Sequence, residues 1–283
     1  MSQRWGAESA ITIAGDGLTA TVVPARGGKI VSLVDANGVE WLTQAAAPTR
    51  DPARPGARFT DAEMAGWDEC APSIEAVTVN GRDIPDHGDL WTIAWHDAGG
   101  GWLQAAGTSF DYEFERSIRS IAGGLRLDYR AEAIQNDVPF LWAAHPQFRA
   151  PAGTVVRVPD LESVVDVLVE PAERMPWSAD LATIDSMPPR GVRKLYVDPA
   201  TSARAASLTR PGTGELSISW TPNCPYLGLW FDNCGFSREA VIAIEPSTGY
   251  YDSLGRAIAN GRVAVLKVGE PLEWSIEVVV DPV

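Results

Sequence analysis

The chain is poor in the residue types that build disulfide frameworks and metal sites. Its 283 residues include only three cysteines, Cys70, Cys224 and Cys234, and three histidines. The scattered cysteines, with no Cys-x-x-Cys pair, exclude a disulfide framework. The sequence contains neither a His-x-x-His nor a His-Glu-x-x-His spacing, the patterns that would indicate a metal site. This cysteine usage is typical of a reducing compartment, and we predict a cytoplasmic protein.

Long hydrophobic runs and an excess of positive charge are also missing. Residues 1–6 lack the apolar segment of a secretory signal, and no run of about 18 apolar residues could cross a membrane. The formal net charge of −14 argues against nucleic acid and anionic membranes as partners, because it repels phosphates. The net charge argues less strongly against a phosphorylated small molecule as ligand, because a local group of arginines can outweigh it. Arg26, Arg149 and Arg193 could bind an anion locally, although solvated or paired arginines explain them more simply.

Alternation of polar and apolar residues dominates the pattern. Phe110, Tyr112 and Phe114 alternate with acidic residues, and the alternation resumes over residues 125–132 after a turn at 122–124. This predicts a long hairpin with one dry and one solvated face. Further strands are expected at residues 30–34, 39–42, 216–220, 227–231, 263–268 and 274–280, the first two joined by a tight turn at Asn37-Gly38.

Segments with a helical pattern are scarce. Residues 160–169 fit a short helix or a strand equally well, and residues 180–196, with Pro188, Pro189 and Gly191, are predicted to be a loop. Residues 43–62 are expected to form a long surface excursion. Many short strands with frequent turns favour an all-β sandwich or barrel. No repeat or linker divides the chain, so we predict a single domain over residues 1–283.

Two titratable residues each follow an apolar run and precede a proline. Glu245 follows residues 240–244 and precedes Pro246, and His145 follows residues 140–144 and precedes Pro146. A carboxylate among apolar groups loses hydration, which predicts a raised pKa for Glu245. We therefore expect an acid and a base at the ends of two buried strands, facing one pocket.

The remaining histidines and the tryptophans add further candidates. His87 lies between Asp86 and Gly88 in a loop, where a binding and a structural role are equally compatible with the pattern, whereas His96 is expected to be structural or exposed. Eleven tryptophans are present, several beside polar candidates. Indole rings offer flat apolar faces to the C–H groups of a pyranose, while carboxylates bind its hydroxyls.

Five segments together resemble the aldose 1-epimerase (galactose mutarotase-like) family. They are VPARGGKI at 23–30, GWDEC at 66–70, PDHG at 85–88, HPQF at 145–148 and EPSTG at 245–249. The resemblance implies an all-β, single-domain β-supersandwich fold and the interconversion of the α and β anomers of a monosaccharide. Because that reaction already proceeds spontaneously, no cofactor and no metal is expected.

The resemblance also implies roles for particular residues. It places the catalytic glutamate at Glu245, the acid histidine at His145 and a second site histidine at His87. Glu245 would remove the O1 proton while protonated His145 donates to the ring oxygen O5. Sugar-binding roles are expected for Trp67, Asp68, Asp86, Arg26, Trp142 and Trp230.

Some positions depart from the family pattern and leave the sugar unspecified. Asp89 stands where a glycine commonly follows the His-Gly segment, and Trp230 stands where classical members place a glutamine. Two alternatives therefore stay open: a carbohydrate-binding protein without catalysis, and a related enzyme for an unusual or anionic sugar. A His₂Glu hydrolase is disfavoured by the histidine spacing, and a thiol hydrolase using Cys70 by the lack of an adjacent base. The sequence does not specify the oligomeric state.

Overall fold

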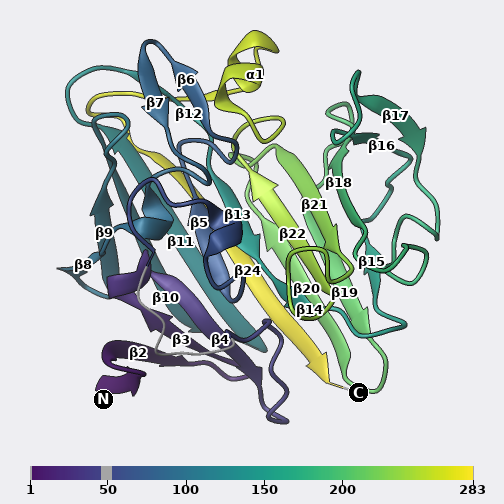
Figure 1. Cartoon of the computed structure of the whole chain (residues 1–283). Coiled ribbons are helices and arrows are strands. Elements are labelled where there is room, and N and C mark those ends of the chain that lie inside the picture. Colours follow the sequence, from purple (N-terminus) through teal and green to yellow (C-terminus); the bar gives the residue numbers. More distant parts are fainter. Residues whose placement is uncertain (1, 46–52, 283) are drawn as a thin grey trace.

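The computed structural model describes residues 2–45 and 53–282, and strands account for most of its regular structure (Figure 1). The predicted excursion at 43–62 therefore falls partly outside the described residues. Every pair of neighbouring strands in the two large sheets is antiparallel, which agrees with the alternating sequence pattern.

The larger sheet has twelve strands among the described residues. Their order is β1 (Ser2–Trp5), β2 (Glu8–Ala14), β3 (Leu18–Val23), β4 (Lys29–Asp35), β5 (Trp67–Cys70), β13 (Ala143–Pro146), β22 (Val241–Ser247), β21 (Tyr226–Asp232), β18 (Val192–Val197), β16 (Ser163–Asp166) and β17 (Glu173–Pro176), with β14 (Phe148–Arg149) also paired to β22.

The second sheet has eight strands in the described part of the chain. Their order is β15 (Val155–Arg157), β19 (Ala205–Arg210), β20 (Gly214–Trp220), β24 (Leu272–Pro282), β11 (Gly124–Ala133), β10 (Tyr112–Ile121), β9 (Trp102–Ala106) and β8 (His96–Gly99). Two small sheets pair β12 (Val138–Phe140) with β23 (Ala264–Leu266) and β6 (Val77–Val79) with β7 (Arg82–Ile84). The helical segments are η1 (Pro24–Arg26), η2 (Phe59–Asp61), η3 (Leu90–Thr92) and α1 (Leu254–Ala259).

The long hairpin predicted from alternation is confirmed as β10 and β11. Tyr112 lies opposite Ala133, and the strands meet at a turn where Gly123 has a φ of 73°, a conformation that favours glycine. Tyr112 and Phe114 are buried, while Glu113 between them is exposed. One face of the hairpin therefore packs into the core and the other meets solvent.

Other local predictions are only partly correct. A tight turn forms at Gly38, but residues 39–42 make isolated bridges and no strand, because the Glu40 carboxylate accepts the Leu33 N–H that a ladder partner would take. Residues 160–169 contain strand β16. The loop predicted for 180–196 is wrong at its end, where the residues after Gly191 form β18.

The main hydrophobic core lies between the two large sheets. One cluster of buried side chains contains Ala20 of β3 and Ile244 of β22 together with Leu127 of β11 and Ile276 of β24. Each sheet thus buries one face against the other, and the predicted β-sandwich fold is confirmed. The single domain over residues 1–283 stays a prediction. Within residues 2–45 and 53–282, no helix has the length and hydrophobicity needed to span a bilayer.

Candidate functional site

Three strands of the larger sheet bring titratable side chains together. β13 carries His145, β22 carries Glu245 and β18 carries Lys194. Gly228 of the intervening strand β21 lies opposite both Glu245 and Tyr196 in its two ladders. A Cβ atom at Gly228 would lie 3.1 Å from Oε2 of Glu245. The missing side chain therefore leaves room for Lys194 to reach Glu245.

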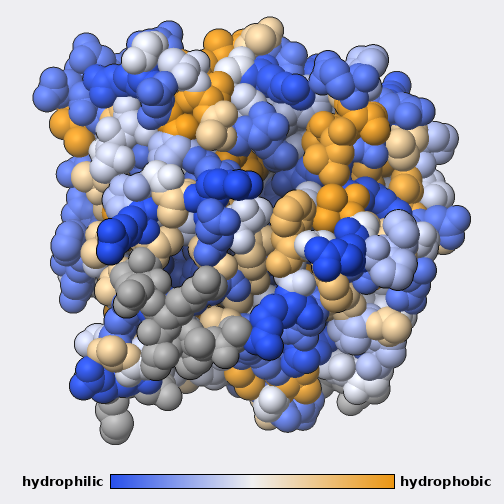
Figure 2. Space-filling model, viewed as in Figure 1, coloured by the Kyte–Doolittle hydropathy of each residue, from blue (hydrophilic) through white to orange (hydrophobic). Residues whose placement is uncertain are grey.

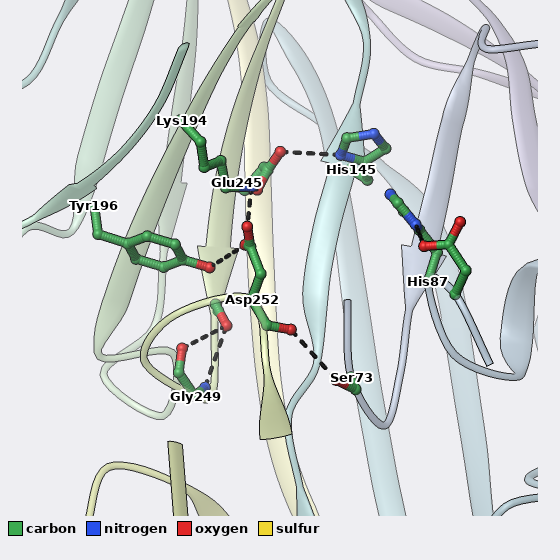
Figure 3. Close-up of polar contacts among 10 residues, drawn as sticks. Ser73, His87, His145, Lys194, Tyr196, Glu245, Gly249 and Asp252 are labelled. Carbon is green, nitrogen blue, oxygen red and sulfur yellow. Dashed lines mark hydrogen bonds and ion pairs between the residues drawn. The ribbon is translucent and has the colours of Figure 1, made fainter. Parts of the chain in front are cut away.

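Both carboxylate oxygens of Glu245 have partners. Oε1 lies 3.0 Å from Nδ1 of His145, and Oε2 forms an ion pair with Nζ of Lys194. Nζ of Lys194 also lies 3.1 Å from Oδ1 of Asp252, which accepts a hydrogen bond from the Tyr196 hydroxyl (Figure 3). The Glu245 side chain is only 1% exposed, so these contacts replace the water it loses on burial.

The pKa of Glu245 is lowered, so the raised pKa predicted from the sequence is wrong. Burial acts to raise it, but the Lys194 ammonium and the hydrogen bond with His145 outweigh burial and lower the pKa to about 2. For Lys194, burial acts to lower the pKa, and the carboxylates of Asp252 and Glu245 outweigh it and raise the pKa. Glu245 and Lys194 are therefore both charged at neutral pH.

His87 brings a second imidazole with a carboxylate partner. Its Nδ1 lies 2.8 Å from Oδ1 of Asp86. Burial lowers the pKa of His87 and outweighs the opposing effect of Asp86, so the ring is neutral at neutral pH. Burial acts to raise the pKa of Asp86, but the hydrogen bond with His87 lowers it overall. An ionised Asp86 accepts the Nδ1 proton, which leaves Nε2 of His87 as an acceptor.

Phe59 of η2 covers the two histidines. Its ring stacks on His87 with centroids 3.9 Å apart and planes 8° apart, and it meets His145 edge-on at 5.2 Å. The Phe59 backbone N–H also donates to Oδ2 of Asp86. The two imidazole centroids are 5.4 Å apart. Two imidazoles, each with a carboxylate on Nδ1, are thus held at a fixed separation.

A cavity of about 160 Å³ adjoins these rings. Its lining consists of Phe59, Thr60, Met64, Ile74, Glu75, Asp86, His87, His145, Lys194, Trp230, Phe236 and Asp252. The volume is below the roughly 300–1,000 Å³ of sites for drug-sized molecules, which favours a ligand the size of a single ring. Figure 2 shows a hollow near the centre of this face, with hydrophobic residues along one side.

Several residues predicted from the sequence come together at this cavity. Asp86, His87, His145 and Trp230 belong to its lining. Glu245 lies directly behind the wall, in contact with His145, and is not part of the lining.

Two tryptophans predicted to contact a sugar belong to the core instead. Trp67 is 1% exposed and meets Phe148 edge-on at 6.3 Å. Trp142 is fully buried, and its Nε1 donates a hydrogen bond to Oε2 of Glu69. Neither side chain reaches the cavity, so the structure does not support a sugar contact for them.

Asp68 and Arg26, also predicted to bind the sugar, form ion pairs outside the cavity lining. Oδ2 of the fully buried Asp68 lies 3.1 Å from Nζ of Lys29. Arg26 forms an ion pair with Glu8, and its guanidinium lies over the Trp5 ring at 4.8 Å. Each charge is already balanced by a neighbour, which explains these residues without a ligand.

The alternatives based on other residues find little support. Among the described residues, no group of three or more His, Cys, Asp or Glu side chains could hold a metal ion. Cys70 is fully buried, and burial raises the pKa of its thiol, so it is not a reactive nucleophile. Arg149 pairs with Glu239, and Arg193 donates to backbone carbonyls.

No protein-family model and no curated protein matches the chain. Solved structures match over nearly its whole length. A galactose mutarotase-like protein from Lactobacillus casei is 18% identical with a TM-score of 0.68, covering 96% of this chain and 100% of that one. A galactose mutarotase related enzyme from Lactobacillus acidophilus is 13% identical with a TM-score of 0.72, covering 96% and 97%. A galactose mutarotase-like protein from Clostridium acetobutylicum is 14% identical with a TM-score of 0.70, covering 99% and 97%.

The chain has the galactose mutarotase-like fold. The β-supersandwich that the sequence resemblance implied is thereby confirmed. Within this mutarotase-like fold, sequence reasoning missed Lys194, Asp252 and Phe59. The apolar residues Leu195, Tyr196 and Val197 directly after Lys194 were the available signal for a strand. Phe59 is the single aromatic residue in an otherwise polar and Ala/Pro-rich segment.

Proposed function

We propose that the protein is an aldose 1-epimerase that interconverts the α and β anomers of a monosaccharide. The observation that carries the proposal is the pair of carboxylate-bound imidazoles, His87 and His145, at one cavity of single-ring size. Ring opening requires loss of a proton from the anomeric hydroxyl and delivery of a proton to the ring oxygen. Two imidazoles at one cavity can supply these two proton transfers, one as the acceptor and the other as the donor. The mutarotase-like fold supports the same reading.

His145 is the proposed acid, and Glu245 acts through it. An ionised Glu245 accepts the Nδ1 proton of His145, which leaves Nε2 for the sugar. Protonated His145 donates from Nε2 to O5, while the carboxylate stabilises the imidazolium. The resemblance implied direct contact of Glu245 with the anomeric hydroxyl. Because both oxygens of Glu245 are engaged and the side chain is 1% exposed, proton exchange through His145 requires no rearrangement.

His87 is the proposed base. Its neutral ring accepts the O1 proton at Nε2, and Asp86 on Nδ1 stabilises the resulting charge. The C1–O5 bond breaks, the C1–C2 bond rotates, and reclosure on the other face reverses both proton transfers. The reaction is an isomerisation, so neither a cofactor nor a metal has a step in this scheme.

The charges of the lining favour a neutral sugar over an anionic one. Glu75, Asp86 and Asp252 contribute carboxylates, against the single ammonium of Lys194, which is already paired. A phosphorylated or acidic sugar would meet net repulsion in this cavity.

An aromatic pair at the cavity offers a surface for the sugar ring. Trp230 and Phe236 stack with centroids 6.1 Å apart, and Phe236 is 53% exposed. In this proposal the C–H groups of the pyranose rest on one of these rings.

The test is anomer exchange from freshly dissolved single anomers of D-glucose, D-galactose and other neutral aldoses, followed by NMR exchange or polarimetry. We expect wild-type protein to accelerate exchange of at least one aldose, and His145→Asn to lose about 10²–10⁴-fold. His96→Asn is the matched control, because His96 is exposed on β8 outside the cavity lining. Saturable sugar binding without acceleration would favour the non-catalytic alternative, and full activity of His145→Asn would contradict the mechanism.

A further inference from the structure

Lys194 is a cavity-lining cation that the acid–base scheme leaves without a task. The sequence contains three lysines, Lys29, Lys194 and Lys267. The side chain of Lys194 is only 4% exposed, yet it belongs to the lining of the cavity. A buried ammonium is costly to dehydrate, so its position beside the proposed acid requires an explanation.

The ammonium of Lys194 is fixed at the wall that presents His145. On one side it contacts Glu245, whose other oxygen meets His145 (Figure 3). On the other side it contacts Asp252, which itself lines the cavity. Because both neighbours of Nζ belong to or directly support the cavity wall, Nζ lies close to the space that a sugar would occupy.

One donor of this ammonium is left over. A lysine ammonium has three N–H groups. Among the described residues, the carboxylates of Glu245 and Asp252 are its two ion-pair partners, and the Tyr196 ring lies 5.6 Å from Nζ, beyond hydrogen-bond distance. The third N–H is therefore available to a molecule in the cavity.

We infer that Lys194 is a further catalytic residue, whose third N–H donates to a sugar oxygen that gains negative charge as the ring opens. This inference rests on the proposed function. The ammonium keeps its proton throughout and forms no covalent bond, so it acts as a preorganised charge, in the manner of an oxyanion-hole donor. The carboxylates of Glu245 and Asp252 hold it in place before the sugar arrives.

The paired carboxylates also keep Lys194 from reacting with the open-chain sugar. An unprotonated amine beside an aldehyde would condense with it to an imine. Burial alone lowers the pKa of Lys194, but Asp252 and Glu245 raise it overall, and the protonated amine has no lone pair for attack. The ring-opened sugar can therefore reclose without being trapped.

The titratable groups that act on Lys194 come from several elements. Asp252, and Glu245 of β22, act on the pKa of Lys194, and the Tyr196 ring of β18 lies 5.6 Å from Nζ. Lys194 in turn acts to lower the pKa of Cys70 of β5 and of Glu75 and His87, which lie in the connections beyond β5. Removal of the ammonium removes a positive charge that lowers the pKa of His87, the proposed base, so the pKa of that imidazole rises. The acid limb of the rate profile should then move toward neutral pH.

Lys194→Met tests the inference against a matched control, Lys29→Met. Lys29 is equally buried and also pairs with two carboxylates, Glu63 and Asp68, but it lies outside the cavity lining. We expect Lys194→Met to lower kcat on the best neutral aldose by about 10²–10³-fold and to shift the acid limb. Lys29→Met should lose stability yet keep kcat and the limb. Equal kcat values in the two variants would overturn the inference.

A binding measurement on wild-type protein separates this inference from the proposed function. With only three lysines, ¹⁵N-lysine labelling gives a simple Nζ spectrum, assigned by the signal missing from Lys194→Arg. D-glucose or D-galactose should shift the Lys194 signal and leave those of Lys29 and Lys267 in place. A shift without anomer exchange would overturn the proposed function and support the contact. Exchange without a shift would overturn the inference alone, and the absence of both would overturn both.

Discussion

The ion pair at Glu245 predicts a specific pH dependence of the free energy of unfolding. The pKa of Glu245 is about 2 in the folded protein, against an ordinary value of 4.5. Because the folded-state value is the lower one, the stabilisation is complete above the unfolded value and is lost as pH falls toward 2. At about 1.4 kcal/mol per pH unit, the lowering contributes about 3 kcal/mol at neutral pH, of which about 2 kcal/mol is lost by pH 3.

Glu245→Gln removes this titration and keeps the shape of the side chain. Urea denaturation of wild type and variant should show that the substitution costs about 2 kcal/mol less at pH 3 than at pH 7. Carboxylates shared by the two proteins titrate in both and cancel in the difference. Glu113→Gln, on the exposed face of β10, is the control and should cost the same at both pH values. An equal cost of Glu245→Gln at pH 3 and pH 7 would refute the reasoning.

Three further substitutions test the supports of the site. Phe59→Ala should raise KM, because the ring stacked on His87 is lost. It should also cost about 3–5 kcal/mol of stability by thermal denaturation. An unchanged KM would contradict the proposal that the Phe59 ring covers the two histidines. Gly228→Ala should lower kcat measured by polarimetry, since its Cβ would lie 3.1 Å from Oε2 of Glu245 and would displace that carboxylate. An unchanged kcat would contradict the role given to the missing side chain. Arg116→Met should cost about 3–5 kcal/mol in urea denaturation by breaking a fully buried ion pair. The pH dependence of kcat should be the same in Arg116→Met as in wild type. A shifted pH dependence would show that the Arg116–Glu69 pair influences the proposed acid and base.

Local sequence patterns predicted the parts of the fold that local physics decides. The alternation around Tyr112 and Gly123 specifies a two-faced hairpin, and the structure contains it as β10 and β11. The apolar run before Glu245 is confirmed as the buried strand β22, whereas the run before His145 is buried but divided between the end of β12 at Phe140 and the start of β13 at Ala143. Both residues lie inside β13 and β22, however, and Pro246 does not end its strand.

Contacts between distant strands could not be read in the same way. Lys194 meets Glu245 across β21, and that meeting depends on the order of strands in the sheet and on the glycine at position 228. No local pattern contains this information. Without Lys194, dehydration was the only visible influence on Glu245, and the direction of its pKa was predicted wrongly.

Two of the three tryptophans predicted to contact a sugar lie away from the cavity. Trp142 lies between β12 and β13, and Trp67 lies on β5 beside Asp68, which is also outside the cavity lining. Trp67 and Trp142 point into the core, whereas Trp230 lines the cavity. Of the three tryptophans, one therefore lies at the cavity and two lie in the core, and a sugar contact by Trp230 stays a prediction.

The segment that carries Phe59 belongs to neither large sheet, although it forms one wall around the histidines. The proposed proton-transfer groups and the residues that enclose them are therefore encoded in separate stretches of the chain. Exchange of residues 53–64 can change which molecules enter, while the strands that hold His145 and Lys194 keep their sequence. Selectivity at this site is thus open to engineering by transplanting one short connection.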